Sequence, residues 1–311
     1  MKLAIVFPGQ GSQSVGMLTG YDAYPEVQAT LIEAGNVLGQ DLWALAAEGP
    51  PEQLNQTVNT QPLMLAADVA VYRAWRGAGG AAPTMVAGHS LGEYAALVVA
   101  GALQLADALP LVRFRAQAMQ EAVPTGVGAM AAIMGIDDAG IAAACAEAAQ
   151  GQIVEPVNFN APGQIVIAGH REAVERAIVA AKAKGAKRGV LLPVSAPFHS
   201  SLLRPAAERL RSYLIDVTVV PSTIPVLHNV DAAIAQGPSA IRAALANQAA
   251  SPIRWVETVR AFVAAGATHI LECGPGQVLT GLCKRIAPDL AVMPMNDGAA
   301  IESALSATST Y

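Results

Sequence analysis

The segment Gly88-His89-Ser90-Leu91-Gly92 constrains the fold of this chain most, because it joins two kinds of secondary structure. The apolar run 85–88 is typical of a buried strand, and the Ala/Leu-rich run 91–100 favours a helix. A strand that turns into a helix within one residue leaves room only for glycine two positions either side of the turn. The serine at the apex then has a strained backbone and an exposed hydroxyl. The pattern therefore predicts that Ser90 is a nucleophile, although the same motif can arise by chance in a chain with 28 glycines.

Composition and charge narrow the class of protein. The 311 residues are 53% hydrophobic and 14% charged, which indicates a compact globular chain of one large or two modest domains. The formal net charge of −5 argues against nucleic acid as a partner, because binding phosphates requires a basic surface. No apolar run reaches the ~18 residues of a membrane span, and the run 3–7 is shorter than the roughly 7–15 residues of an export signal. We therefore expect no export signal and no membrane association.

The three cysteines indicate neither disulfide bonds nor a metal centre. Cys145, Cys273 and Cys283 are odd in number, lie far apart and form no Cys-x-x-Cys pair. Such cysteines are typical of reduced thiols in a protein core. We therefore expect a cytoplasmic protein without a metal site.

Strand and helix patterns alternate over most of the chain, which predicts a mostly parallel sheet covered by helices. The expected strands are 3–7, 85–88, 223–228, 268–273 and 291–295. The expected helices are 24–38, 62–76, 91–100, 106–121, 201–214, 238–248, 252–265 and 277–287. Active sites on such sheets gather at the carboxyl ends of the strands. We therefore expect the loop 8–13, Ser90 and the segment 273–276 to meet at one edge.

A different pattern occupies the middle of the chain. Its order is strand, helix, strand, strand, helix, strand, which is the ferredoxin-like unit. The expected strands are 128–134, 153–159, 164–168 and 188–194, and the expected helices are 137–149 and 171–184. Because this unit can bury its own sheet face, we predict a small ferredoxin-like domain at 125–196. It is inserted into a large α/β domain formed by 1–124 and 197–311.

A serine nucleophile needs a base, and the chain has five histidines. His89 is adjacent to the serine, His269 begins an apolar strand, and His170 ends a strand of the small domain. His199, at the junction of the two predicted domains, and His228, after a short apolar run, both remain candidates, and either could instead be structural. No aspartate stands out as the third member of a triad; Asp231, Asp289 and Asp297 are possible.

Arg115 lies within the predicted helix 106–121, stacked between Leu111 and Met119, so its side chain is expected to point into the protein. A buried guanidinium left unpaired would be costly, so it requires a carboxylate. That carboxylate belongs either to an internal Asp or Glu, which the residues alone favour, or to a substrate. The loop around Gln10 could supply backbone amides for an oxyanion, or could be an ordinary strand-to-helix connection.

Several segments together resemble the malonyl-CoA:acyl carrier protein transacylases of bacterial fatty-acid synthesis. They are Gly-Gln-Gly-Ser-Gln at 9–13, Gly-His-Ser-Leu-Gly-Glu at 88–93, Arg115 with the following 119–124, Asn158 to Gln164, Phe198-His199, and Gly274-Pro275-Gly276. The resemblance runs from Phe7 to about residue 296, with the motifs in the family's order. It implies an α/β-hydrolase-like large domain carrying a ferredoxin-like insert.

The resemblance also implies roles for particular residues. Ser90 would be the nucleophile and His199 its base, with the imidazole oriented by the backbone carbonyl of Gln248 instead of an aspartate. Arg115 would hold the free carboxylate of the malonyl group. The oxyanion hole would be formed by the backbone amides of Gln10 and Leu91. Gln61 would line the pocket, and Phe198 resembles the malonyl-selecting version of related acyltransferases. The tail from Gly298 onward matches nothing diagnostic and is interpreted as a surface end.

The implied activity is transfer of a malonyl group from malonyl-CoA to the phosphopantetheine thiol of acyl carrier protein, through a malonyl-serine intermediate. It needs no cofactor beyond these substrates. Lys182, Lys184, Lys187 and Arg188 are a candidate docking patch for the acidic carrier, although a charge run is more often a solvated face. A monomer is expected. The alternatives are a malonyltransferase of malonate decarboxylase or polyketide assembly, and a serine esterase or thioesterase.

Overall fold

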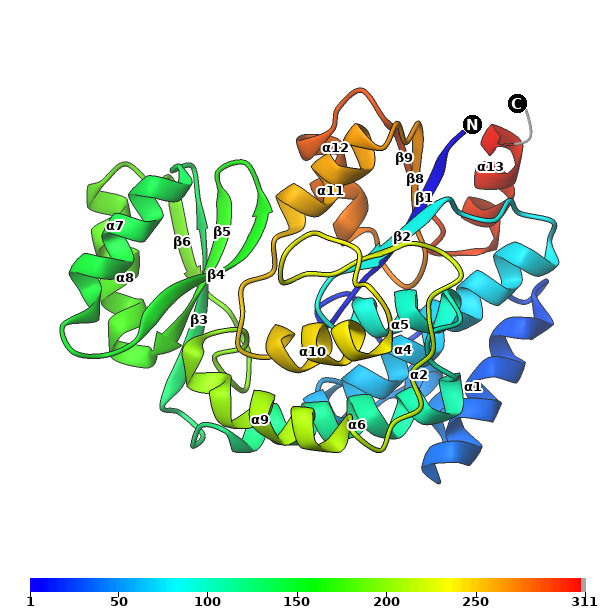
Figure 1. Cartoon of the computed structure of the whole chain (residues 1–311), viewed down its shortest axis with the longest axis horizontal. Coiled ribbons are helices and arrows are strands. Elements are labelled where there is room, and N and C mark those ends of the chain that lie inside the picture. Colours follow the sequence, from blue (N-terminus) through cyan, green and yellow to red (C-terminus); the bar gives the residue numbers. More distant parts are fainter. Residues whose placement is uncertain (309–311) are drawn as a thin grey trace.

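The computed structural model describes residues 1–308 and contains two sheets of different kinds (Figure 1). The larger sheet has the order β7-β2-β1-β8-β9, and every neighbouring pair in it is parallel. Its strands are β1 (Leu3–Phe7), β2 (Met85–Gly88), β7 (Val226–Leu227), β8 (His269–Glu272) and β9 (Ala291–Pro294). A parallel sheet requires crossover connections, and helices supply them here.

Helices cover both faces of the larger sheet. They are α1 (Pro25–Leu38), α2 (Leu42–Glu48), α3 (Pro51–Leu54), α4 (Thr57–Gly77), α5 (Gly92–Val99), α6 (Leu105–Glu121), η1 (Ser201–Leu203), α9 (Arg204–Tyr213), α10 (Pro238–Gln248), α11 (Trp255–Ala264), α12 (Val278–Ile286) and α13 (Gly298–Thr308). Alternate residues of β1 face opposite sides, as the period of a strand requires. Ile5 and Phe7 join the core that includes α1, α4, α5 and α6, whereas Val6 packs with Trp255 and Phe262 of α11.

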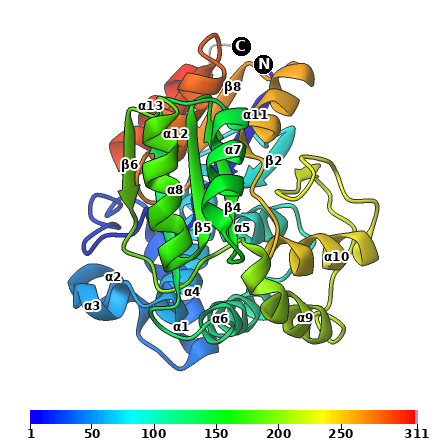
Figure 2. The same ribbon diagram turned by 90° about the vertical axis from the view of Figure 1, so that its left-hand side faces the viewer.

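The smaller sheet is antiparallel, with the order β4-β5-β3-β6. Its elements are β3 (Gly128–Met134), α7 (Asp138–Ala149), β4 (Val154–Ala161), β5 (Gln164–His170), α8 (Arg171–Ala183) and β6 (Arg188–Leu191). Helices α7 and α8 lie together on its outer face (Figure 2). Together, a parallel sheet and this β-α-β-β-α-β unit confirm the predicted fold class; the domain limits at 125 and 196 stay a prediction.

The two sheets are joined by packing and by hydrogen bonds. Side chains from the inner face of the small sheet, Met130 and Val166 among them, belong to the same buried cluster as the large sheet. The backbone N–H of Phe159 on β4 donates to the carbonyl of Ile253, and the backbone N–H of Ile253 donates to the carbonyl of Val157. The carboxylate of Glu155 accepts hydrogen bonds from the backbone N–H and hydroxyl of Ser201 at 2.7 and 2.8 Å.

The sequence-based prediction for the tail was wrong. Of this tail, Gly298–Thr308 forms α13, whose Ile301 and Ala304 are fully buried in the main core, and the last three residues lie outside the described range. This segment is rich in alanine and has only a weak apolar pattern. Which of its residues are buried therefore becomes evident only from the structure, where the helix packs against the core.

Smaller differences concern element limits. Helices α2 and α3 were not predicted, the strand expected at 223–228 spans only two residues, and α4 begins five residues before Pro62, the position expected to start it. In residues 1–308, no helix combines the length and apolar character needed to cross a membrane.

Candidate active site

Ser90 stands at the turn between β2 and α5, at the carboxyl end of the parallel strands. Its φ of 52° places it in the left-handed region that a residue other than glycine seldom occupies. A side chain on Gly88 would place its Cβ 1.8 Å from the carbonyl carbon of Gly92, and one on Gly92 would lie 2.1 Å from the Phe7 oxygen. The backbones therefore approach so closely that both positions require glycine, as the motif predicted.

His199 is the imidazole that the fold brings to Ser90. Its Nε2 lies 2.8 Å from Ser90 Oγ, and its Nδ1 lies 2.8 Å from the backbone oxygen of Gln248. Because a carbonyl can only accept, Nδ1 carries the proton, and in the neutral ring the lone pair of Nε2 faces the serine hydroxyl. His199 is itself held at a φ of 66°, so both residues of the pair have left-handed backbones.

Burial lowers the pKa of His199, and the positive charge of Arg115 lowers it further, to about 3. The ring is only 4% exposed, so its charged form would lack solvation. The imidazole is therefore neutral at neutral pH, which is the state that can take a proton from a serine.

The other candidates for a base or a triad member have different partners. His228 Nδ1 lies 2.7 Å from Glu93 Oε1, and although burial lowers its pKa, the Glu93 charge raises it above the ordinary value. Asp231 and Asp297 accept hydrogen bonds from nearby backbone N–H groups, of Ala233 and Ala300 respectively. Asp289 is exposed.

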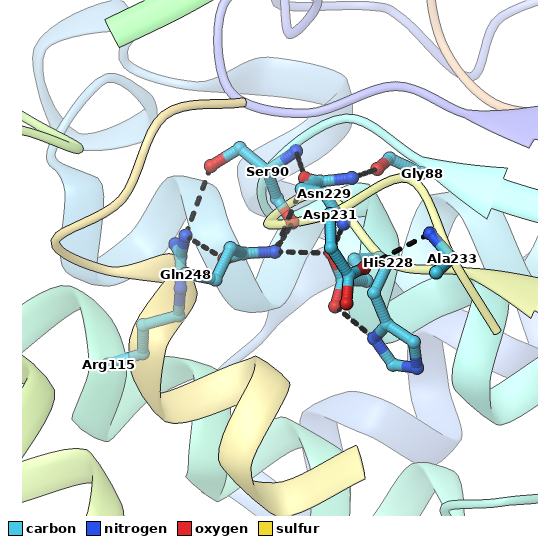
Figure 3. A network of polar contacts seen from close by, with 9 residues as sticks. Gly88, Ser90, Arg115, His228, Asn229, Asp231, Ala233 and Gln248 are labelled. Carbon is cyan, nitrogen blue, oxygen red and sulfur yellow. Dashed lines mark hydrogen bonds and ion pairs between the residues drawn. The ribbon is translucent and has the colours of Figure 1, made fainter. Parts of the chain in front are cut away.

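The Arg115 side chain enters the same site from α6 and is only 2% exposed. Its Nη1 donates to Gln61 Oε1 at 2.8 Å. Its Nη2 donates to Gln248 Oε1 at 2.7 Å and to Ser90 Oγ at 3.0 Å (Figure 3). Its Nε has no partner in residues 1–308, and no carboxylate of this range forms an ion pair with it. The internal ion pair that the residues alone favoured is therefore not found there.

Gln61 and Gln10 are linked through Thr57. The Gln61 Nε2 donates to Thr57 Oγ1 at 3.1 Å, and that hydroxyl donates to Gln10 Oε1 at 2.8 Å. This arrangement directs the oxygen of the Gln61 amide toward Arg115. The loop that carries Gln10 packs against the Ser90 turn, since a Cβ on Gly9 would lie 2.5 Å from the His89 oxygen.

These residues surround a cavity of about 130 Å³ between the two sheets. Its lining is Gln10, Gln61, His89, Ser90, Leu91, Arg115, Met119, Met130, Asn158, Leu192, Val194, Phe198 and His199. Gln248 is not part of this lining, but it contacts two residues that are, Arg115 and His199. A small cavity with one buried cation beside a nucleophile suits a short acyl group that ends in an anion.

Sequence reasoning missed a group of buried polar residues that contact the backbone around Ser90. Asn229 accepts the Ser90 N–H with its Oδ1 at 2.7 Å and donates its Nδ2 to the Gly88 oxygen at 2.7 Å (Figure 3). Glu93 accepts from the backbone N–H of Asn229 at 2.9 Å and contacts His228 as described above. A signal existed: Glu93 is the only charged residue of α5, and Asn229 follows a strand at the active edge.

The chain is similar to known acyltransferases over nearly its whole length. A family model described as acyl transferase domain matches residues 4–292. The malonyl CoA-acyl carrier protein transacylase of Escherichia coli strain K12 is 55% identical over 305 residues, which cover 98% of this chain and 99% of that protein. Among solved structures, the acyl-carrier-protein S-malonyltransferase of Burkholderia pseudomallei 1710b is 58% identical, with a TM-score of 0.97 and coverage of 98% and 100%. A malonyl-transacylase in complex with a type II PKS acyl-carrier protein is 52% identical, with a TM-score of 0.98 and coverage of 99% and 100%.

Proposed function

The chain belongs to the acyl transferase domain family, among the malonyl CoA-acyl carrier protein transacylases, and on that premise we propose that a Ser90–His199 pair carries the malonyl group through a covalent intermediate. The overall reaction moves the group from malonyl-CoA to the phosphopantetheine thiol of acyl carrier protein. The observation that carries the proposal is the buried Arg115 guanidinium, which donates to Ser90 Oγ at 3.0 Å and has no carboxylate partner in residues 1–308.

In the first half-reaction, Ser90 Oγ attacks the thioester carbon while its proton passes to His199 Nε2. The tetrahedral intermediate collapses with cleavage of the C–S bond, and the proton on His199 goes to the sulfur of CoA. Malonyl-Ser90 remains. Because Arg115 is one cause of the low pKa of His199, a substrate carboxylate paired with Arg115 makes the imidazole a stronger base when the malonyl group is in place.

The second half-reaction runs the same chemistry in reverse. The carrier thiol gives its proton to His199 and its sulfur attacks the ester carbon, after which the C–O bond to Ser90 breaks and the proton returns to Oγ. Each chemical step passes through an oxyanion that needs hydrogen-bond donors. The Ser90 N–H is already bonded to Asn229, so we assign this role to the backbone amides of Gln10 and Leu91, two residues of the pocket lining.

Selection of the acyl group falls to Arg115 and Phe198. Arg115 supplies a charge for the malonyl carboxylate, and the paired group is then held in one orientation beside Ser90. Gln61 and Gln248 orient the guanidinium through their amide oxygens. Phe198 lies in the cavity wall, where its ring crowds an α-methyl substituent. No cofactor takes part in this scheme.

The carrier approaches from the small sheet in our proposal. Lys182, Lys184, Lys187 and Arg188 are exposed, and Lys184 also pairs with Glu147 at 2.9 Å. From Arg188 the chain runs along β6 to Leu192, a residue of the cavity wall, which is about 13 Å in extended conformation. A basic patch at that distance suits an acidic carrier whose flexible arm must reach Ser90. The monomeric state and the cytoplasmic location stay predictions.

Intact-protein mass spectrometry tests the proposal. Incubation with malonyl-CoA alone should add one malonyl group, and later addition of fatty-acid acyl carrier protein should remove it and malonylate the carrier. Ser90→Ala should show neither change. Prompt release of free malonate instead of transfer would favour a serine thioesterase. Preference for a polyketide carrier or for the carrier of a malonate decarboxylase would leave the proposed malonyl transfer intact but would assign the protein to a different pathway.

A further inference from the structure

We propose that Glu93 is the counter-charge of Arg115, held one amide away by the side chain of Gln248, and that this spacing leaves the guanidinium free for the substrate carboxylate. The inference rests on the proposed function, in which Arg115 binds the malonyl group. It assigns a positioning role to Glu93, which lines no part of the pocket.

Glu93 is fully buried at the start of α5, three residues after the nucleophile. Its Oε1 contacts His228 Nδ1 at 2.7 Å, and its Oε2 accepts from the backbone N–H of Asn229 and from Gln248 Nε2, both at 2.9 Å. A buried carboxylate is stable only with such donors around it. All of these partners lie within or next to the active site.

Gln248 connects this carboxylate to Arg115. Its Nε2 donates to Glu93 and also to the Ser90 carbonyl oxygen, each at 2.9 Å, while its Oε1 accepts from Arg115 Nη2 at 2.7 Å (Figure 3). A carboxylate can only accept and a guanidinium can only donate. The amide can therefore adopt just one of its two orientations, and Glu93 and Arg115 determine that orientation together.

The intervening amide resolves a conflict between stability and binding. A buried cation without a counter-charge destabilises the folded protein, because its desolvation is not offset. A carboxylate in direct contact would form a bidentate pair with Arg115 and occupy the donors that a substrate needs. With Gln248 between them, the negative charge still acts on Arg115 through a poorly screened interior. Burial lowers the pKa of Arg115, and Tyr94 and then Glu93 act in the opposite direction.

Glu93→Gln removes the charge and can keep the hydrogen bonds. The new amide can turn its oxygen toward Asn229 and Gln248 and its NH₂ toward His228, whose Nδ1 then accepts. The Arg115 charge would lack its counter-charge until a malonyl group arrives. We expect a lower melting temperature for the free protein, and a malonyl-induced rise in melting temperature that exceeds the wild-type rise by about 2 °C or more.

The exchange variant Glu93→Gln/Gln248→Glu moves the carboxylate one position, into direct contact with Arg115, without changing net charge or side-chain size. We expect the malonyl-induced rise to be lost, and the ratio of kcat/KM for malonyl-CoA over acetyl-CoA to fall by about tenfold or more. If Glu93→Gln proves too unstable to purify, this variant still decides the matter, since an unchanged ratio contradicts the proposal.

Glu272→Gln is the matched control, because Glu272 is also fully buried and accepts from two backbone N–H groups, of Leu279 and Thr280. It should lower the melting temperature and leave the malonyl-induced rise unchanged. The same result for Glu93→Gln would make Glu93 a structural residue and overturn the inference. Failure of the wild-type protein to become malonylated, checked by intact mass in the same samples, would instead count against the proposed function.

Discussion

At the scale of single residues, the site depends on groups held in states that they would not adopt alone. Ser90 and His199 have left-handed backbones, and Arg115 is a charge in the protein interior. Each state costs free energy and persists because neighbouring contacts determine it. For Ser90 these contacts are the hydrogen bonds to Asn229 and Gln248.

Replacing Arg115 should remove the selection for an anionic acyl group. For Arg115→Ala we expect the ratio of kcat/KM for malonyl-CoA over acetyl-CoA to fall by about 100-fold, the size expected when one partner of a buried charge pair is lost. Arg113→Ala is the control on the same helix, because Arg113 is only partly buried and contacts the Leu38 carbonyl and Gln40. An unchanged ratio in Arg115→Ala would mean that the arginine is structural.

The low pKa of His199 has a consequence for stability. In the unfolded chain a histidine titrates near pH 6.5, whereas in the folded protein His199 titrates at about 3. Between these values the unfolded state binds one more proton here, so the free energy of unfolding decreases as the pH falls. In His199→Gln this contribution is absent, and urea titrations between about pH 6.5 and 4.5 should give a shallower loss of stability than in the wild type. If stability falls equally steeply with pH in the two proteins, the low pKa of His199 is contradicted.

At the scale of elements, the junction of β2 and α5 determines the position of Ser90. It depends on two glycines, because a Cβ on Gly88 would clash with the backbone at the start of α5 and a Cβ on Gly92 would clash with the backbone of Phe7 and Pro8. Hydrogen bonds along β1 and β2 bring the loop after each strand to the same edge. The position of Ser90 is therefore a property of the sheet as much as of its own motif.

Gly92→Ala should destabilise this junction strongly. The added Cβ would lie 2.1 Å from the Phe7 carbonyl oxygen, so backbone must move, and we expect a loss of about 3 kcal/mol or more in the free energy of unfolding. Gly281→Ala is the control, since Gly281 lies inside α12 with nothing near its Cβ position. That substitution should raise stability by up to about 1 kcal/mol in the same urea titration. Equal effects of the two changes would refute this account of the turn.

At the scale of the whole molecule, the proposed Ser90–His199 pair joins segments that follow strands of the two different sheets. Ser90 follows β2 of the large sheet, whereas His199 follows β6, the last strand of the small one. The loop of His199 is held by the Glu155 carboxylate on β4, which accepts from Ser201. The backbone bonds between β4 and Ile253 add a second connection.

Glu155→Ala should loosen this connection. We expect a loss of about 1–3 kcal/mol in stability, because two hydrogen bonds to a carboxylate disappear, and a fall in kcat of about tenfold as His199 becomes less well positioned. Glu147→Ala, which removes an exposed carboxylate of the small unit, should change neither value measurably. Normal kcat in Glu155→Ala would show that the loop is positioned without this contact.

Much of this protein follows from its sequence alone. The Ser90 motif, the order of the elements and the burial of Arg115 depend on neighbours within a few residues, because helical and strand periods are local. The resemblance to a family added the proposed roles of His199 and Gln248. The tail was misread because its sequence has only a weak apolar pattern, so its burial could not be predicted without the core surface against which α13 packs.

Only the tertiary structure decided which distant groups meet. His199 contacts Ser90 from 109 positions along the chain, and Gln248 contacts it from 158. His228, the other histidine that the sequence left open as a base, contacts Glu93 instead. Such pairings depend on the order and register of the strands, which no local pattern contains. For the same reason, the neutral partners of Arg115 could not be foreseen from its own helix.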